Sequence, residues 1–227
     1  IDKILNPEEL NLENIRDLSI LEPFGAGNEQ PLFLLPKTVL RQVIPVSDNK
    51  HLRLKLDFGM VAVTAMLFNT STEQFCYQPG EVLDLVCNIS LNEYRGRDYL
   101  SVSVRDLRPS SFVEQNFFNG KAYYEMFRRG EHLTQKVREK MLPDRKETAV
   151  VFQYLQKHKG FLGDVDLLYP VFASKMNYCK FRLSIDALQD VGLLELSPLL
   201  NRISMLPWEE KVDLQQAQTI NRLRGEL

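Results

Sequence analysis

Residues 51–58 alternate strictly between polar and apolar side chains, and this period of two constrains the fold more than any other feature of the chain. The order along the segment is His51, Leu52, Arg53, Leu54, Lys55, Leu56, Asp57, Phe58. Successive side chains of a β-strand point to opposite faces of a sheet. The segment is therefore expected to be a strand with one buried face and one solvated face.

Four further segments have the composition of strands, namely residues 38–44, 61–68, 82–91 and 100–104. Gly59-Met60 is suited to a hairpin turn, and residues 92–98, with Arg95-Gly96 inside, are predicted to form a loop. Five antiparallel strands within residues 35–110 predict a small closed barrel, and the OB-fold is the commonest such barrel.

The segments on either side of the predicted barrel have helical spacing. Within residues 1–34, a capped helix is predicted to begin after Asn6, and apolar residues recur at helical spacing up to Leu21. The segment ends in a Gly-rich loop, Gly25–Asn28, which is either a phosphate-binding nest or a structural turn. Helices are predicted over 121–141, 145–157, 165–172 and 181–191, followed by a hairpin of 193–196 and 203–206. The fold class is thus mixed and multi-domain: an OB-like barrel followed by an α-rich domain, residues 111–227, whose part 145–227 resembles a winged helix.

Composition narrows the class of protein. The chain has 28 Lys and Arg against 30 Asp and Glu, a net charge of −2, which argues against a strongly basic nucleic-acid binder. The cysteines, Cys76, Cys87 and Cys179, have no C-x-x-C spacing, so neither a disulfide framework nor a zinc site is predicted, and a cytoplasmic location is expected. No apolar run reaches the ~20 residues of a membrane span. Because the chain opens with Ile-Asp-Lys and no signal peptide, we expect it to be part of a longer protein. We also expect it to act as a monomer.

Cations and aromatic residues gather at two places in the predicted barrel, the solvated face of the 51–58 strand and the hairpin around Arg95-Gly96. Proteins that bind single strands place cations along the phosphates and aromatic rings against the bases. The same residue types also occur on any solvated strand, and spacing alone leaves these two interpretations equal. The candidate nucleic-acid contacts are Arg53, Lys55, Tyr94, Arg95, Arg97 and Tyr99.

A second set of polar residues opens the third helix of the winged-helix-like part, where a groove-reading helix would carry them. Asp186 and Asp190 follow on the same element and oppose a phosphate. A contact with DNA or with a protein partner is expected here. The candidates for this contact are Lys175, Tyr178, Lys180 and Arg182.

Three stretches of the sequence resemble the RecJ family of single-strand-specific exonucleases. Residues 21–33, LEPFGAGNEQPLF, are similar to the end of the DHHA1 domain of that family, and His51-Leu52-Arg53-Leu54 and Asn92-Glu93-Tyr94-Arg95-Gly96 are similar to its OB-domain signatures. The resemblance covers residues 1 to about 110, and residues 111–227 resemble the extra C-terminal region found in some Gram-positive members.

The resemblance implies a parent enzyme of DNA repair and recombination that degrades single-stranded DNA from the 5′ end with two divalent metals, Mn²⁺ or Mg²⁺. Its D-H-D and D-H-H motifs do not occur here, and His51, His132 and His158 lack neighbouring aspartates. This chain is therefore expected to be a non-catalytic, nucleic-acid-binding part, without cofactor or metal, that guides single-stranded DNA to a nuclease core outside it. The alternative is a module that docks a repair or replication protein such as single-stranded-DNA-binding protein.

Overall fold

The computed structural model describes residues 1–208 and 212–225, apart from the side chain of Gln215, and divides the chain into two compact units. The N-terminal unit is Ile1–Ser110 and the C-terminal unit begins at Ser111. Each has its own core of buried apolar residues. No described helix is long and apolar enough to cross a membrane.

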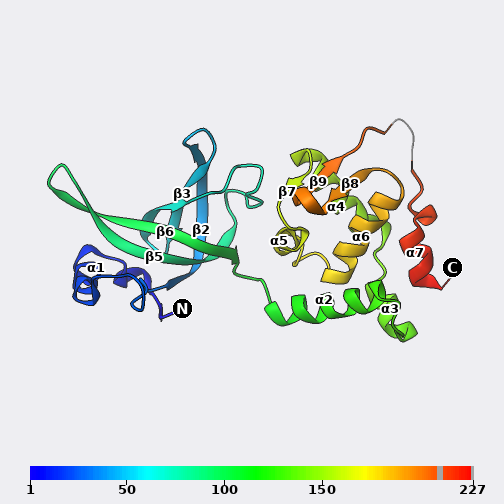
Figure 1. The fold of residues 1–227 in the computed structure, drawn as a ribbon, viewed down its shortest axis with the longest axis horizontal. Coiled ribbons are helices and arrows are strands. Elements are labelled where there is room, and N and C mark those ends of the chain that lie inside the picture. The colour runs from blue at the N-terminus through cyan, green and yellow to red at the C-terminus, as the bar shows by residue number, and fades with distance from the viewer. Residues whose placement is uncertain (209–211, 226–227) are drawn as a thin grey trace. The chain divides into compact units, whose positions relative to one another are not determined.

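The N-terminal unit is a closed β-barrel, as predicted (Figure 1). Its five strands follow the ring order β2-β3-β4-β6-β5, and a β2–β5 pairing closes the ring. The antiparallel prediction fails at one place, because β4 and β6 run parallel. An odd number of strands cannot alternate direction around a closed ring, so one parallel pair is required. The strands are β2 (Phe33–Val46), β3 (His51–Phe58), β4 (Val61–Leu67), β5 (Val82–Tyr94) and β6 (Arg97–Pro109).

The alternating pattern that predicted β3 is confirmed by burial. Leu52 and Leu54 are fully buried while Arg53 and Lys55 are exposed. Each buried leucine contributes about 1.5–3 kcal/mol through removal of its side chain from water. Residues 68–81, between β4 and β5, add Phe75, Cys76 and Tyr77 to the buried set.

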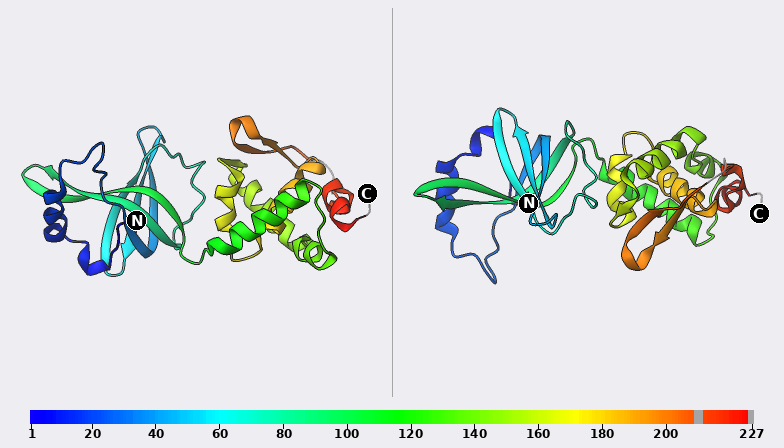
Figure 2. Two further views of the ribbon diagram at one scale, coloured as in Figure 1. Left: turned by 60° about the horizontal axis from the view of Figure 1, so that its bottom comes forward. Right: turned by 90° about the horizontal axis from the view of Figure 1, so that it is seen from above.

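Residues 1–32 pack on the barrel rather than forming one continuous helix. Strand β1 (Lys3–Ile4) pairs with the start of β2, and three short helices follow, η1 (Pro7–Glu9), α1 (Leu12–Asp17) and η2 (Leu18–Leu21). The Asn6 cap predicted from the sequence is present as a capping box with Glu9. Helix α1 buries Ile15 and packs against β5 and β6, whose hairpin extends beyond the barrel (Figure 2).

The C-terminal unit is α-rich and carries a small sheet of order β7-β9-β8. The helix predicted over 121–141 is in fact two, because Gly130 takes a left-handed φ of 73° and ends the first. The elements are α2 (Glu114–Arg128), α3 (Gln135–Met141), α4 (Arg145–His158), β7 (Phe161–Leu162), α5 (Val165–Leu168), η3 (Tyr169–Val171), α6 (Tyr178–Asp190), β8 (Leu194–Ser197), η4 (Pro198–Leu200), β9 (Arg202–Met205), η5 (Leu214–Gln216) and α7 (Gln218–Arg224).

Helix α6 is the centre of the C-terminal unit. It begins at Tyr178, earlier than predicted, because the side chain of Asn177 accepts a hydrogen bond from the Lys180 amide at 3.0 Å. Helices α2, α4 and α7 pack around it (Figure 1), and most of its residues from Tyr178 to Leu188 are buried. The helix is thus enclosed rather than open on one side.

The contact between α2 and α6 generates a stability prediction at Gly120. A Cβ atom there would lie 2.8 Å from Cβ of the buried Tyr178. In an open helix, Gly→Ala stabilises by roughly 0.5–1 kcal/mol, but overpacking costs about 1–3 kcal/mol. We expect Gly120→Ala to lower the free energy of unfolding by about 1 kcal/mol or more. Urea unfolding followed by the fluorescence of Trp208, the single tryptophan, which packs against Phe152 in this unit, measures it.

The matched control is Asn119→Ala, at the exposed neighbouring position of the same helix. It should leave the unfolding midpoint nearly unchanged. An increase in stability for Gly120→Ala would contradict the packing described.

Candidate nucleic-acid interface

Two of the predicted contacts, Arg53 and Lys55, lie on the outer face of the barrel formed by β3 and β4. Arg53 and Lys55 point outward from β3 and lie opposite Met66 and Thr64 of β4. The Lys55 ammonium donates a hydrogen bond to Thr64 Oγ1 at 2.8 Å, whereas no ion pair of Arg53 is found among the described residues. Both cations are exposed and available to a ligand.

The parallel pairing of β4 with β6 extends this outer face from β4 to β6. Met66 lies beside Ser103, and Ser103 and Ser101 pair in turn with Asn88 and Ser90 of β5. Because residues in register share a face, the half-buried Ser90, Ser101 and Ser103 continue the surface that bears Arg53. Asn88 points the same way but is buried, and its amide donates hydrogen bonds to the carbonyls of Gln30 and Pro31. Met66 and the serines were missed in the sequence, because nothing in it shows which strand lies beside β4.

The hairpin of β5 and β6 is longer than the sequence predicted. Residues 92–98 are not a loop: the ladder runs to the pair Tyr94 and Arg97, and only Arg95 and Gly96 form the turn. Both turn residues have positive φ, 52° and 71°, the requirement of a two-residue turn that matches the strand twist. The hairpin therefore projects the predicted aromatic and basic residues on a regular ribbon.

The two faces of this ribbon carry different chemistry. Tyr94 pairs with Arg97, and Tyr99 follows two residues later on the same face, with Tyr94 and Tyr99 61% and 48% exposed. The Arg95 guanidinium lies over the Tyr94 ring, 5.1 Å from its centroid.

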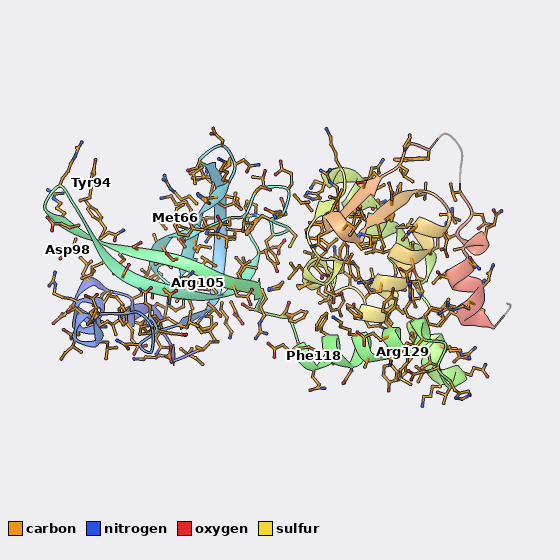
Figure 3. The ribbon with its side chains drawn as sticks, in the orientation of Figure 1. Met66, Tyr94, Asp98, Arg105, Phe118 and Arg129 are labelled. Atoms are coloured by element: carbon orange, nitrogen blue, oxygen red, sulfur yellow. The ribbon has the colours of Figure 1, made fainter. Side chains whose placement is uncertain are left out.

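The acidic residues Glu93 and Asp98 pair with each other on the opposite face. Figure 3 shows Tyr94 and Asp98 near the end of the hairpin, with α1 on the Asp98 side. There Asp98 accepts a hydrogen bond from Arg16 of α1 at 2.7 Å. The acids of the ribbon are thus turned toward α1, away from the face with Tyr94 and Arg97.

The Gly25–Asn28 loop is occupied by its own contacts. Gly25 and Asn28 exchange backbone hydrogen bonds of 2.8 and 3.1 Å, and the Asn28 side chain donates to the carbonyls of Leu21 and Pro23. The structural-turn interpretation accounts for these contacts, which hold the end of η2 against the loop.

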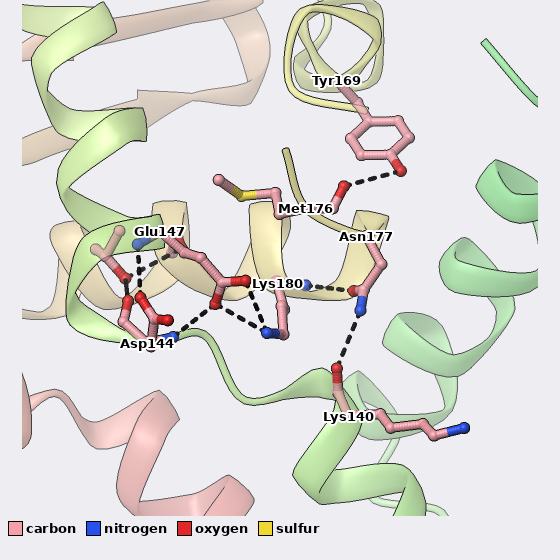
Figure 4. Close-up of polar contacts among 9 residues, drawn as sticks. Lys140, Asp144, Glu147, Tyr169, Met176, Asn177 and Lys180 are labelled. Carbon is pink, nitrogen blue, oxygen red and sulfur yellow. Dashed lines mark hydrogen bonds and ion pairs between the residues drawn. The ribbon is translucent and has the colours of Figure 1, made fainter. Parts of the chain in front are cut away.

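In the C-terminal unit, most of the predicted contacts are directed inward. Lys175 is exposed, but Lys180 pairs with Glu147 at 2.7 Å (Figure 4), and Arg182 pairs with Asp166 at 3.1 Å and lies over the Tyr124 ring. Burial would raise the pKa of Asp166, but hydrogen bonds from Lys121 and Tyr178 more than offset it and leave that pKa lowered. The carboxylate therefore stays ionised and holds the surrounding donors.

The placement of Tyr178 corrects the sequence prediction. Its side chain is 1% exposed, packs against α2 beside Gly120, and donates its hydroxyl hydrogen to Asp166. Burial raises its pKa. The ring belongs to the core because α6 begins at this residue, and it is not available to a nucleic acid.

Comparison with known proteins decides the family of the N-terminal unit. Residues 1–106 match the family model of the RecJ OB domain. These residues belong to the RecJ OB domain family.

Similar proteins include the single-stranded-DNA-specific exonuclease RecJ of Bacillus subtilis (strain 168), 26% identical over 113 residues, which are 49% of this chain and 14% of that protein. The solved structures of RecJ from Thermus thermophilus with Mg²⁺ and with Mn²⁺ are 26% and 25% identical. The matches cover 47% and 50% of this chain and 16% of those chains, with TM-scores of 0.36 and 0.37. The chain thus spans about one seventh of the length of its curated relative.

The strand order of the RecJ OB domain shows which of its elements correspond to the oligonucleotide-binding surface of OB-folds in general. OB-folds bind oligonucleotides with the second and third barrel strands and with the loops after the first and fourth. In this RecJ OB domain those elements are β3, β4, the turn at residues 47–50 and the turn at Arg95-Gly96. The face bearing Arg53 and the hairpin turn thus coincide with that surface.

Proposed function

We propose that this chain is the single-strand-binding part of a RecJ-like exonuclease. The outer face of the barrel receives single-stranded DNA and guides it to a nuclease core that lies outside these 227 residues. The observation that carries the proposal is the segregation on the β5–β6 hairpin, where Tyr94, Arg97 and Tyr99 share one face while Glu93 and Asp98 occupy the other. Asp98 is held by Arg16 of α1, so the face that the hairpin leaves open to a ligand is the one with Tyr94, Arg97 and Tyr99.

The chemistry of the face suits a single strand. Arg53, Lys55, Arg95 and Arg97 supply cations for phosphates, and Tyr94 and Tyr99 supply exposed rings for bases. Such contacts read no particular sequence and weaken with salt. The net charge of −2 is no obstacle, because acids near the face are neutralised locally, Asp57 by Arg41 at 2.6 Å and Asp98 by Arg16.

The hydrolytic step is assigned to the remainder of such a protein. A two-metal site needs clustered carboxylates and imidazoles. Among residues 1–208 and 212–225, no three His, Cys, Asp or Glu side chains are placed to share a metal ion. The side chains described here therefore do not fit Mg²⁺ or Mn²⁺, and the role proposed for them is binding.

The C-terminal unit favours a second role, docking of a protein partner such as single-stranded-DNA-binding protein. Its helix α6 is enclosed and its cations Lys180 and Arg182 are paired internally. Leu199 and Leu200, by contrast, expose 97% and 66% of their surface in the turn between β8 and β9. A unit that exposes these leucines, while Lys180 and Arg182 of the predicted contact are paired internally, suits a protein surface better than a phosphate backbone there.

The first test removes the four cations of the face together, as Arg53→Ala, Lys55→Ala, Arg95→Ala and Arg97→Ala. Each phosphate contact on a single strand contributes about 0.7 to the slope of log affinity against log salt. We expect weaker oligonucleotide binding and a slope smaller by up to about 3, the sum over four such contacts, measured by fluorescence anisotropy from low to moderate salt.

The control for this variant removes the same charge from exposed cations of the C-terminal unit, Lys136, Lys140, Arg145 and Lys146. It should leave the slope within error of the parent. Equal flattening by both sets would mean that net charge, not this face, governs binding.

A second test removes the C-terminal unit. A chain ending at Ser110 keeps the whole barrel and the hairpin. We expect its affinity for a single-stranded oligonucleotide to stay within about threefold of the full chain, since none of the proposed contacts is lost. Loss of nearly all binding, with the barrel still folded by circular dichroism, would instead assign the nucleic-acid site to residues 111–227.

A further inference from the structure

The outer face of the barrel carries a further aromatic pair, Phe68 and His51. Phe68 follows β4 immediately and is 48% exposed, although it is a large apolar side chain. Its ring meets the ring of His51, the first residue of β3, edge to face at a centroid distance of 5.3 Å and an interplanar angle of 71°. The exposed Phe68 is thus held by a neighbour rather than by the core.

The orientation of this pair is fixed by the backbone. The amide of Asn69 donates a hydrogen bond to Nδ1 of His51 at 2.9 Å. The imidazole therefore cannot rotate freely, and its edge contact restricts the Phe68 ring. An aromatic pair of this geometry is stabilised beyond simple burial. The ring is positioned before any ligand arrives, which lowers the entropic cost of binding.

Alternation places the pair on the same face as the cations. His51 is two residues from Arg53 on β3, and Arg53 lies directly opposite Met66 of β4. Phe68 lies one residue past the end of β4, two residues from Met66, and its ring contacts His51. An exposed ring beside an exposed guanidinium is the combination already found at Tyr94 and Arg97. The sequence alternation marked His51 only as a polar position of a strand.

The two aromatic groups are separated along the face by small polar residues. Leu67 lies beside Val104 of β6, and Tyr99 is five residues earlier on β6, roughly 17 Å along the strand at about 3.4 Å per residue. Between them lie Ser101 and Ser103, both half-buried. The face therefore has an exposed aromatic ring at each end, Phe68 and Tyr99, and small polar side chains between them.

We propose that Phe68 is a base-stacking residue of this face and that His51 is its positioning residue. The inference rests on the proposed binding of single-stranded DNA and deepens it: the ligand is recognised through unpaired bases at the β3–β4 end as well as at the hairpin. A duplex keeps its bases stacked inside and cannot offer them to this ring.

The test compares two ligands, an oligothymidylate and a strand of equal length made of abasic spacers, with the full chain and with Phe68→Leu. Leucine keeps apolar volume but removes the aromatic face. We expect at least about fivefold weaker binding of the oligothymidylate, the consequence of losing about 1 kcal/mol of stacking. Binding of the abasic strand and the salt slope should stay unchanged.

Two further variants complete the experiment. Phe118→Leu makes the same substitution at an exposed phenylalanine of α2, 59% exposed, and should leave both affinities unchanged. His51→Gln should lower the preference for the base-bearing strand over the abasic one, a readout that a merely structural effect on the barrel would not move.

The outcomes separate this inference from the function on which it rests. If Phe68→Leu binds the oligothymidylate as the parent does, or loses affinity equally for both ligands, the stacking role is wrong while salt-dependent binding by the cations stands. If the parent chain binds neither ligand at low salt, the proposed function fails, and the stacking role fails with it.

Discussion

A closed ring of five strands must contain one parallel pair. In this barrel the parallel pair of β4 and β6 determines where the chain crosses over and which outer faces adjoin. The chain leaves β4 and crosses to β5 through residues 68–81, which bury Phe75, Cys76 and Tyr77 on the way. Burial raises the pKa of Cys76 to about 12, so its thiol stays neutral and can lie in the core. The parallel pairing then sets Met66 of β4 beside Ser103 of β6. Through this contact the outer face of the β3–β4 hairpin and that of the β5–β6 hairpin become one surface.

Segregation of side chains on that surface connects the fold with its proposed function. Inside the ring, leucines such as Leu52 and Leu54 fill the core, and the residues between them are forced outward. On the projecting hairpin the same alternation sends Tyr94 and Arg97 to one side and Glu93 and Asp98 to the other, where Arg16 of α1 neutralises Asp98. A chain with a net charge of −2 thereby presents a local group of cations and rings. Helix α1 contributes both to the packing of the hairpin and to its charge balance.

Much of the barrel was predictable because period-two alternation is a local property of the chain. The positions of β3 and of the hairpin turn at Gly59-Met60 follow from it directly. What the sequence does not contain is the partner of each strand, so the parallel pair, Met66 and the serines of β6 were missed. The hairpin at Arg95-Gly96 was predicted as a long loop because its polar residues resemble loop residues, although two positive φ angles suffice for the turn. In the C-terminal unit, Tyr178 was taken for a surface residue because the start of α6 depends on the Asn177 cap and on packing against Gly120.

The central claim is that one continuous outer face of the barrel, from Phe68 to Tyr94, carries the single strand. Photochemical cross-linking of the full chain to a single-stranded oligonucleotide with 5-iodouracil at successive positions, followed by mass spectrometry of the linked peptides, tests it most directly, because this chromophore links preferentially to nearby aromatic side chains. The account predicts cross-links at Tyr94 and Tyr99 and, from other positions of the same strand, at Phe68. Cross-links confined to residues 111–225 at saturating oligonucleotide would contradict it.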